Sequence, residues 1–156
     1  LNQVISVIHK ELAGSAQNIS LIWQPGSNLC NVNVDPEQIA VIIKNVVTNA
    51  IESINQTGQV LIRTDLMLLQ SSTSIDASTI PSGQYLLLEI ADNGRGMDAE
   101  TKAQITDPFF TTRPQDHAMG LGMSVAFGLI QQNQGFLQIH SQKNKGTRVH
   151  IYFPAS

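Results

Sequence analysis

The sequence has little cysteine, little charge and no long apolar run, and each shortage argues against a class of protein. Cys30 is the only cysteine, so no disulfide can form within the chain, and we expect a reducing compartment. No apolar run approaches the roughly 18 residues of a membrane-spanning helix. The 4 histidines lack the spacing of a zinc site. The formal net charge of -3 argues against a nucleic-acid scaffold, although a phosphate site needs only a few local donors.

The remaining composition, 42% hydrophobic over 156 residues, is that of one globular domain. Residues 1–16 carry apolar residues at a helical spacing, and we expect them to end a helix of a preceding domain. The domain proper should then cover residues 17–156. Because the chain begins inside this helical pattern and without Met, we expect it to be a piece of a longer protein.

The most informative stretch is an apolar run that ends in one carboxylate. Residues 85–90 have the length and composition of a strand, so Asp92 should lie at a strand end. Gly94 and Gly96 follow; they permit positive φ and leave no side chain to hold a ligand away from the backbone. A carboxylate beside bare backbone suits a flat, nitrogen-rich ring such as adenine. The alternative is a plain Asp-Asn-Gly turn that closes a hairpin.

A second informative stretch is a helix predicted from its capping sequence at Asp35 and Pro36 to about Ile54. Asn45 and Asn49 are four residues apart, so they stack on one face beside the apolar stripe. They are either two exposed asparagines without a role or two amide oxygens that point into a pocket. An amide oxygen is a hard, neutral ligand for Mg²⁺, which keeps most of its waters and bridges to phosphates.

Strands are predicted at 19–23, 31–34, 59–69, 84–91, 136–141 and 147–153. Apolar residues alternate clearly in 31–34, 136–141 and 147–153, whereas 85–90 is an apolar run. We expect 31–34 to pair with 19–23, and the Ser/Thr-rich residues 70–83 to form a mobile hairpin loop without chemistry. Two more helices are expected, at 98–105 and from Leu121 to about Gln132. Together these elements predict an α/β fold, a two-layer sandwich. Its mixed, mainly antiparallel sheet of about five or six strands should be covered on one face by three helices.

A glycine pair opens the last of these helices. Gly120 and Gly122 flank Leu121, where free N–H groups and the positive end of the helix dipole make a ready anion site. Packing of the helix on the sheet is the alternative explanation of the pair. Upstream, the two Phe at 109–110 lie between prolines and predict a loop anchored by aromatic packing.

In this order, the Asn pair, the Asp-x-Gly-x-Gly strand end, Pro-Phe-Phe-Thr-Thr, Gly-Leu-Gly-Met and a Gly-Thr hairpin form one constellation. It resembles the catalytic ATP-binding domain of sensor histidine kinases, within the superfamily shared with gyrase, heat-shock chaperone and mismatch-repair ATPases. The resemblance covers the chain from about Ile19 to Phe153. Pro-Phe-Phe-Thr-Thr at 108–112 is most similar to kinases of the nitrogen-regulation type.

The resemblance implies ATP and Mg²⁺ as cofactors and gives roles to the matching residues. Asn49 should ligate Mg²⁺ while Asn45 supports the phosphates, and Asp92 should accept the adenine amino group. Arg113 should reach phosphate, and Thr147 should help to hold adenine through water. The other residues implied to contact the nucleotide are Gly94, Gly96, Met97, Phe109, Gly120, Leu121, Gly122 and Met123.

The chain departs from the family pattern at three points. Arg113 stands where kinases of that type usually carry Lys, and Arg can reach phosphate bidentately. Ala118 and Met119 replace the first two residues of the usual Gly-Thr-Gly-Leu-Gly box, which bears on lid geometry and ATP affinity. No phosphate-accepting His motif is present, so the resemblance implies that this motif lies upstream.

Asn45 bears on the chemistry. The hydrolysing members of the superfamily place Glu four residues before the metal-binding Asn, whereas a neutral amide cannot take a proton from water. The chain should therefore hold Mg-ATP without efficient hydrolysis and present the γ-phosphate to a histidine of another domain, with Asn45 and Arg113 as its catalytic residues. Two alternatives stay open: a degenerate nucleotide-binding or scaffold module, which Ala118 and Met119 favour, and a stand-alone ATPase, which Asn45 disfavours.

The resemblance also implies partners outside the chain. These are an upstream dimerisation and phosphoacceptor domain and a response regulator, with a homodimeric parent protein and no nucleic acid. We expect the domain to be cytoplasmic and leave open whether its parent protein is anchored in a membrane.

Overall fold

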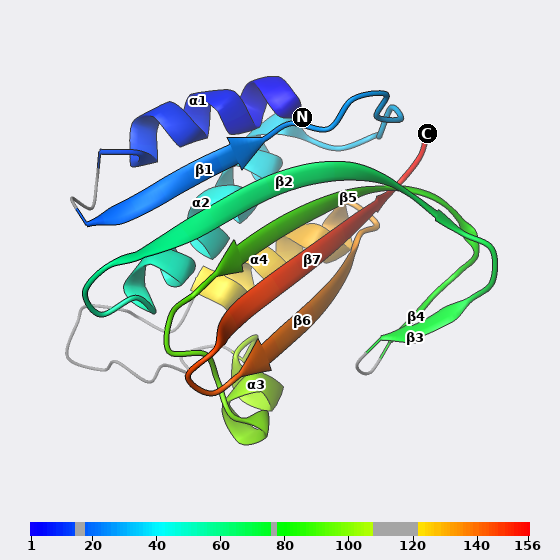
Figure 1. Ribbon diagram of the computed structural model, residues 1–156. Coiled ribbons are helices and arrows are strands. Elements are labelled where there is room, and N and C mark those ends of the chain that lie inside the picture. The colour runs from blue at the N-terminus through cyan, green and yellow to red at the C-terminus, as the bar shows by residue number, and fades with distance from the viewer. Residues whose placement is uncertain (15–17, 76–77, 108–121) are drawn as a thin grey trace.

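The computed structural model describes residues 1–14, 18–75, 78–107 and 122–156. One layer is a five-stranded sheet and the other consists of helices (Figure 1). None of the helices in these ranges has the length and hydropathy of a transmembrane segment. The elements are α1 (Asn2–Leu12), β1 (Ile19–Gln24), α2 (Pro36–Glu52), β2 (Gly58–Leu69), β3 (Thr73–Ile75), β4 (Ser78–Ile80), β5 (Gly83–Asp92), α3 (Ala99–Gln104), α4 (Gly122–Gln132), β6 (Phe136–Gln142) and β7 (Gly146–Pro154).

The main sheet has the strand order β1-β2-β5-β7-β6. β1 runs parallel to β2, and the other neighbours are antiparallel, so the predicted mixed, mainly antiparallel sheet is confirmed. The predicted pairing of residues 31–34 with β1 is wrong, since Val32 instead forms an isolated bridge with Ala155. The physical reason is the crossover: α2 connects β1 to β2, and a helical connection lets two consecutive strands pair in parallel.

Helices α1, α2 and α4 pack on one face of the sheet, and their apolar residues form the main core with the strands (Figure 1). Two of them, α2 and α4, are among the three helices predicted to cover the sheet, whereas the sequence pattern assigns α1 to a preceding domain. In β5, Leu86, Leu88 and Ile90 point into this core because alternate residues of a strand face the same side. Ile5 and Ile8 of α1 belong to the same core, so this helix is packed onto the domain. A fourth helix, α3, contacts β6.

Residues 70–83, predicted to be a loop, contain a small hairpin of β3 and β4. Ile75 and Ile80 of this hairpin form a second apolar cluster with Tyr85, Leu87 and Tyr152. Those three residues alternate with the residues of the main core, so the hairpin covers part of the sheet face that lies away from the helices. We call this face the open face.

Local capping fixes where α2 begins. The Asp35 side chain accepts hydrogen bonds from the backbone N–H groups of Glu37, at 2.8 Å, and Gln38, at 3.3 Å. The Asp35 N–H in turn donates to Asn133 Oδ1 at 3.0 Å, beyond the end of α4. The cap therefore sets the start of α2 and ties it to the neighbouring helix, as the capping sequence predicted for Asp35 and Pro36.

We expect Ile42→Ala to lower the free energy of unfolding by about 2 to 5 kcal/mol, because it removes buried methyl groups and leaves a cavity. Ile42 is fully buried, at 0% exposure, in the middle of α2. Val41→Ala, at the neighbouring position with 42% exposure, is the matched control and should change stability by less than about 0.5 kcal/mol. Urea denaturation measures both, and equal losses would contradict the placement of the α2 core face.

Candidate functional site

Asp92, the last residue of β5, turns its carboxylate toward the helix layer. Oδ1 accepts hydrogen bonds from Ser53 Oγ at 3.0 Å and from the Gly94 N–H at 2.8 Å. Ser53 is the C-cap residue of α2, and its hydroxyl also lies 2.7 Å from the Ala50 carbonyl oxygen. The carboxylate is therefore held in a fixed orientation between the end of β5 and the end of α2.

Two opposing effects act on the pKa of Asp92. Burial raises the pKa above its ordinary value of 3.8, while hydrogen bonds from the Gly94 N–H, the Ser53 hydroxyl and the Thr147 N–H lower it; burial is the larger effect. A half-buried acid whose donors are already in place is a preorganised acceptor, and perturbed acids of this kind cluster at functional sites.

The two glycines after Asp92 are required by close packing within the protein. A Cβ at Gly94 would collide with Ser53, and a Cβ at Gly96 would collide with the Gln142 carbonyl. Gly96 also has a φ of +65°, which favours glycine. Between them, the Arg95 N–H donates to the Ser53 carbonyl at 3.0 Å. The loop therefore packs between the end of α2 and the β6–β7 turn. Contact of these glycines with a ligand stays a prediction.

Ser141 joins this loop to Thr147. Its hydroxyl oxygen accepts from the Met97 N–H at 2.8 Å, lies 2.8 Å from Thr147 Oγ1 and donates to the Gly146 carbonyl at 3.2 Å. Ser53 and Ser141 were both missed by the sequence reasoning. The signal for Ser141 was its register, because it lies directly opposite Thr147 in the β6–β7 pair and on the same face.

Asn45 and Asn49 are both half-buried on α2, which packs along α4. A Cβ at Gly122 would lie 3.8 Å from Asn45 Oδ1, so the start of α4 comes close to the amide pair. In the described residues, no group of three or more His, Cys, Asp or Glu side chains is arranged to hold a metal ion. The amide of Asn49 fits Mg²⁺ in a different manner, as one protein ligand to an ion that takes its other ligands from water and phosphate.

Four of the predicted site residues lie outside the described ranges, and a fifth has its side chain in the core. Phe109, Arg113, Gly120 and Leu121 lie outside the described residues. Met123 has its side chain in the main core, so only its backbone is available to a ligand. The other predicted site residues are described by the structure, and the fold brings them to the helix side of the sheet. They are Asn45, Asn49, Asp92, Gly94, Gly96, Met97, Gly122 and Thr147.

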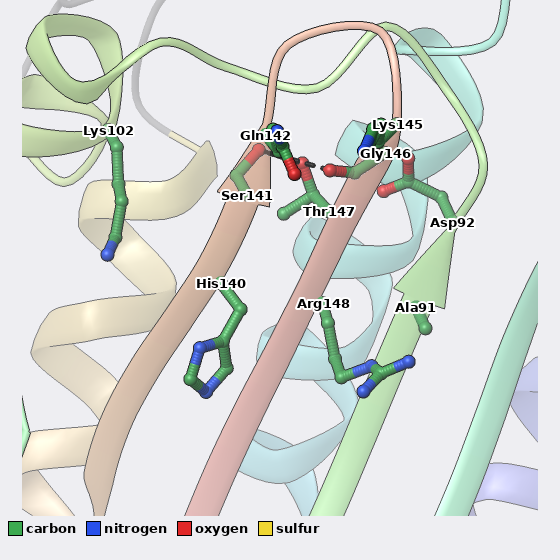
Figure 2. Close-up of a pocket in the computed structure, with 10 residues that line it drawn as sticks. All are labelled: Ala91, Asp92, Lys102, His140, Ser141, Gln142, Lys145, Gly146, Thr147 and Arg148. Carbon is green, nitrogen blue, oxygen red and sulfur yellow. Dashed lines mark hydrogen bonds between the residues drawn. The ribbon is translucent and has the colours of Figure 1, made fainter.

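A cavity of about 400 Å³ lies at the ends of β5, β6 and β7. Asp92 and Thr147 line it together with Lys102, His140 and Arg148 (Figure 2). Asp92 and Thr147 have the strand parity of the main core, whereas His140 and Arg148 have the opposite parity and belong to the open face. The cavity therefore brings together residues from both faces of the sheet.

One family of known proteins matches most of the chain. The family model described as histidine kinase-, DNA gyrase B- and HSP90-like ATPase matches residues 34–156. The sensor kinase CckA of Brucella abortus is 30% identical over 88% of this chain and 15% of its own length. The sensor histidine kinase ZraS of Escherichia coli strain K12 is 25% identical over 100% of this chain and 30% of its own length. The chain thus spans less than a third of these curated relatives.

Solved structures share the fold. The catalytic domain of the histidine kinase ThkA matches with a TM-score of 0.76 at 22% identity, over 98% of this chain and 92% of that chain. At this identity the likeness shows the fold alone, and it agrees with the predicted two-layer α/β sandwich.

We expect Asp92→Asn to raise the free energy of unfolding at pH 7. Because burial raises the pKa of Asp92 above 3.8 in the folded chain, the folded state binds the Asp92 proton more tightly than the unfolded state. The resulting stability is present below pH 3.8 and is lost as the pH rises through the folded pKa. The neutral amide avoids this loss while its oxygen still accepts from Ser53 and Gly94.

Urea denaturation of both proteins at several pH values tests this expectation. The advantage of the variant should shrink as the pH falls through the folded pKa and below 3.8, where Asp92 becomes protonated in both states. A stability difference that stays the same at every pH would contradict the assigned cost of burial.

Proposed function

The chain belongs to the family of histidine kinase-, DNA gyrase B- and HSP90-like ATPases, and on that premise we propose that it is the catalytic domain of a sensor histidine kinase. It would bind Mg-ATP and present the γ-phosphate to a histidine on a separate, upstream domain. The observation that carries this proposal is the oriented, half-buried carboxylate of Asp92, held between Ser53 and Gly94 on the helix side of the sheet.

We assign the adenine to Asp92. An exocyclic amino group donates hydrogen bonds and needs an acceptor, and a carboxylate fixed by its own donors accepts without reorganising. Thr147 lies opposite Asp92 in the β5–β7 pair, and Ser141 holds its hydroxyl at 2.8 Å. Met97 is bound to the same serine, so the proposed adenine contacts form one hydrogen-bonded unit.

We assign the phosphates to the C-terminal half of α2, where Asn49 and Asn45 precede Ser53 by about one and two turns. Asn49 is the proposed ligand of Mg²⁺, and Asn45, next to the start of α4, is proposed to support the phosphates. When bound, Mg²⁺ neutralises phosphate charge. Asn45 has no basic group with which to activate water, which favours transfer over hydrolysis. Arg113 and the glycine box at Gly120 complete the proposal, on residues outside the described ranges.

The partners and setting belong to the same proposal. We propose an upstream dimerisation and phosphoacceptor domain whose last helix ends within residues 1–16, a homodimeric parent protein, and a response regulator as the final acceptor. The names of the relatives, a sensor kinase and a sensor histidine kinase, support this. We also propose a cytoplasmic setting, where ATP is available, and membership of the nitrogen-regulation type, which depends on residues 108–112.

A second candidate is a degenerate module of the same fold that binds nucleotide weakly and serves as a scaffold. The observation that favours it is the replacement of the usual Gly-Thr by Ala118 and Met119 at the start of the second glycine box. The two candidates differ in whether the chain binds Mg-ATP at all.

We expect the chain to bind Mg-ATP saturably. It should release no more phosphate from ATP than a control without protein that is incubated for the same time. Calorimetric titration measures binding, and a phosphate-release assay measures hydrolysis. Absence of binding would favour the scaffold, and sustained phosphate release would favour a stand-alone ATPase. Asp92→Ala should weaken binding at least about tenfold, since it removes a charged hydrogen-bond acceptor.

The matched control is Asp65→Ala, which removes an exposed acid from β2. It should leave ATP affinity unchanged. Circular dichroism of both variants separates lost binding from lost folding. ATP affinity that is unaltered in a folded Asp92→Ala variant would contradict the adenine assignment.

We expect Asn49→Ala to weaken ATP binding about tenfold in the presence of magnesium and to leave binding in EDTA unchanged, because the amide is proposed to contact the ion rather than the nucleotide. Thr48→Ala, on the exposed side of the same turn, is the control. An unaltered magnesium requirement in the Asn49 variant would count against the metal assignment.

A further inference from the structure

Ser53 is the side chain that donates to Asp92 among the described residues. Its hydroxyl oxygen lies 3.0 Å from Asp92 Oδ1 and 2.7 Å from the Ala50 carbonyl oxygen. A hydroxyl carries one proton, so Ser53 can donate to only one of these two acceptors at a time. The other donors to the carboxylate are the backbone N–H groups of Gly94 and Thr147, which cannot turn away. Ser53 is therefore the donor whose direction can change.

The charge of Asp92 decides which acceptor receives the Ser53 proton. An ionised carboxylate is the stronger acceptor, because hydrogen bonds to a charged group are about twice as strong as neutral ones. A protonated Asp92 carries an O–H group of its own, which can donate to the Ser53 oxygen while Ser53 donates to the Ala50 carbonyl. Each hydroxyl proton of this short chain of groups thus has an acceptor in both states.

The position of Ser53 also decides which oxygen of Asp92 carries the proton. Oδ1 accepts from Ser53 and from the Gly94 N–H at 2.8 Å, and of these two partners only the hydroxyl can accept in return. A proton on Oδ1 therefore has an acceptor in Ser53, and Oδ2 stays an acceptor. Without the hydroxyl, the proton is better placed on Oδ2, where water accepts it and where it would face an incoming donor.

Burial and hydrogen bonds, rather than neighbouring charges, shift the pKa of Asp92 among the described residues. The charged or titratable residues on the elements around it are Glu52 of α2, Arg95 of the loop, Lys102 of α3, His140 of β6, Lys145 of the β6–β7 turn and Arg148 of β7. The causes of the pKa shift are burial and the bonds from Gly94, Ser53 and Thr147, and only the Ser53 bond comes from a side chain that a substitution can remove.

We propose that Ser53 is a positioning residue of the nucleotide site. By turning its hydroxyl from Asp92 to the Ala50 carbonyl, it holds the proton of a protonated Asp92 on Oδ1, so that Oδ2 accepts from the adenine amino group in both states. The inference rests on the proposed function, because it takes adenine as the ligand of Asp92. The alternative is a serine that only caps its own helix, since serine hydroxyls often bond the carbonyl three or four residues back.

Ser53→Ala removes the hydroxyl and tests the proposal. Calorimetry measures the Kd of Mg-ATP for the variant and for the unaltered chain at several pH values, so the titration of ATP itself cancels in their ratio. The ratio should be about three above the pKa of Asp92 and about ten or more below it, because only the protonated variant turns an O–H group toward the ligand. Ser53→Thr keeps a hydroxyl and should stay within about twofold of the unaltered chain at every pH.

Ser20→Ala is the matched control, because Ser20 is an exposed serine of β1. It should leave the Kd unchanged, and circular dichroism checks that each variant is folded at each pH. A ratio that is the same at every pH would overturn the proposal and leave the proposed function standing. A folded Ser53→Thr variant that behaves like Ser53→Ala would do the same.

A titration of Asp92 without nucleotide separates the two proposals. NMR of its side-chain carboxyl carbon should give a higher pKa in Ser53→Ala than in the unaltered chain, because the Ser53 bond lowers the pKa of Asp92. An Asp92 pKa that Ser53→Ala leaves unchanged would overturn the role of Ser53, whatever the chain binds. Failure of the unaltered chain to bind Mg-ATP would instead overturn the proposed function and, with it, adenine as the ligand.

Discussion

The hydrogen bond between Ser53 and Asp92 is the contact on which the proposed site depends, because it joins the end of α2 to the end of β5. Asn49 and Asn45 precede Ser53 by four and eight residues on one helix, or by about 6 and 12 Å along its axis. The acid and the two amides therefore lie in one rigid frame, in the order that a ring followed by its phosphates would need. This order supports the proposed direction of the nucleotide.

The loop after Asp92 owes its shape to packing against the protein itself. Gly94 lies against Ser53 and Gly96 lies against the β6–β7 turn, each at a distance that a Cβ would not permit. A motif whose glycines suggested open space for a ligand thus also has an internal reason for them. Both reasons can hold, because the same close packing is what fixes the carboxylate of Asp92 in place.

Local patterns in the sequence predicted the elements better than their partners. The apolar run of β5, the period of two in β7 and the cap at Asp35 are read within a few residues, and the structure has these elements. The parallel pairing of β1 with β2 depends on a crossover through α2, which no local pattern reports. Ser53 and Ser141 were missed for a similar reason, since their bonds to Asp92 and Met97 span 39 and 44 residues.

The strand register separates the two polar surfaces at this end of the sheet. Asp92 and Thr147 face the helices, while their neighbours Ala91 and Arg148 face the other side, so one residue of slip would exchange the acidic and the basic surface. The apolar residues of the main core and the ion pair between Glu89 and Arg63 on the open face both oppose such a slip. The slip would bury charge on the helix side and expose apolar residues on the other. The same constraint that builds the core therefore keeps the side chains of Asp92 and Arg148 on opposite faces of the sheet at one strand end.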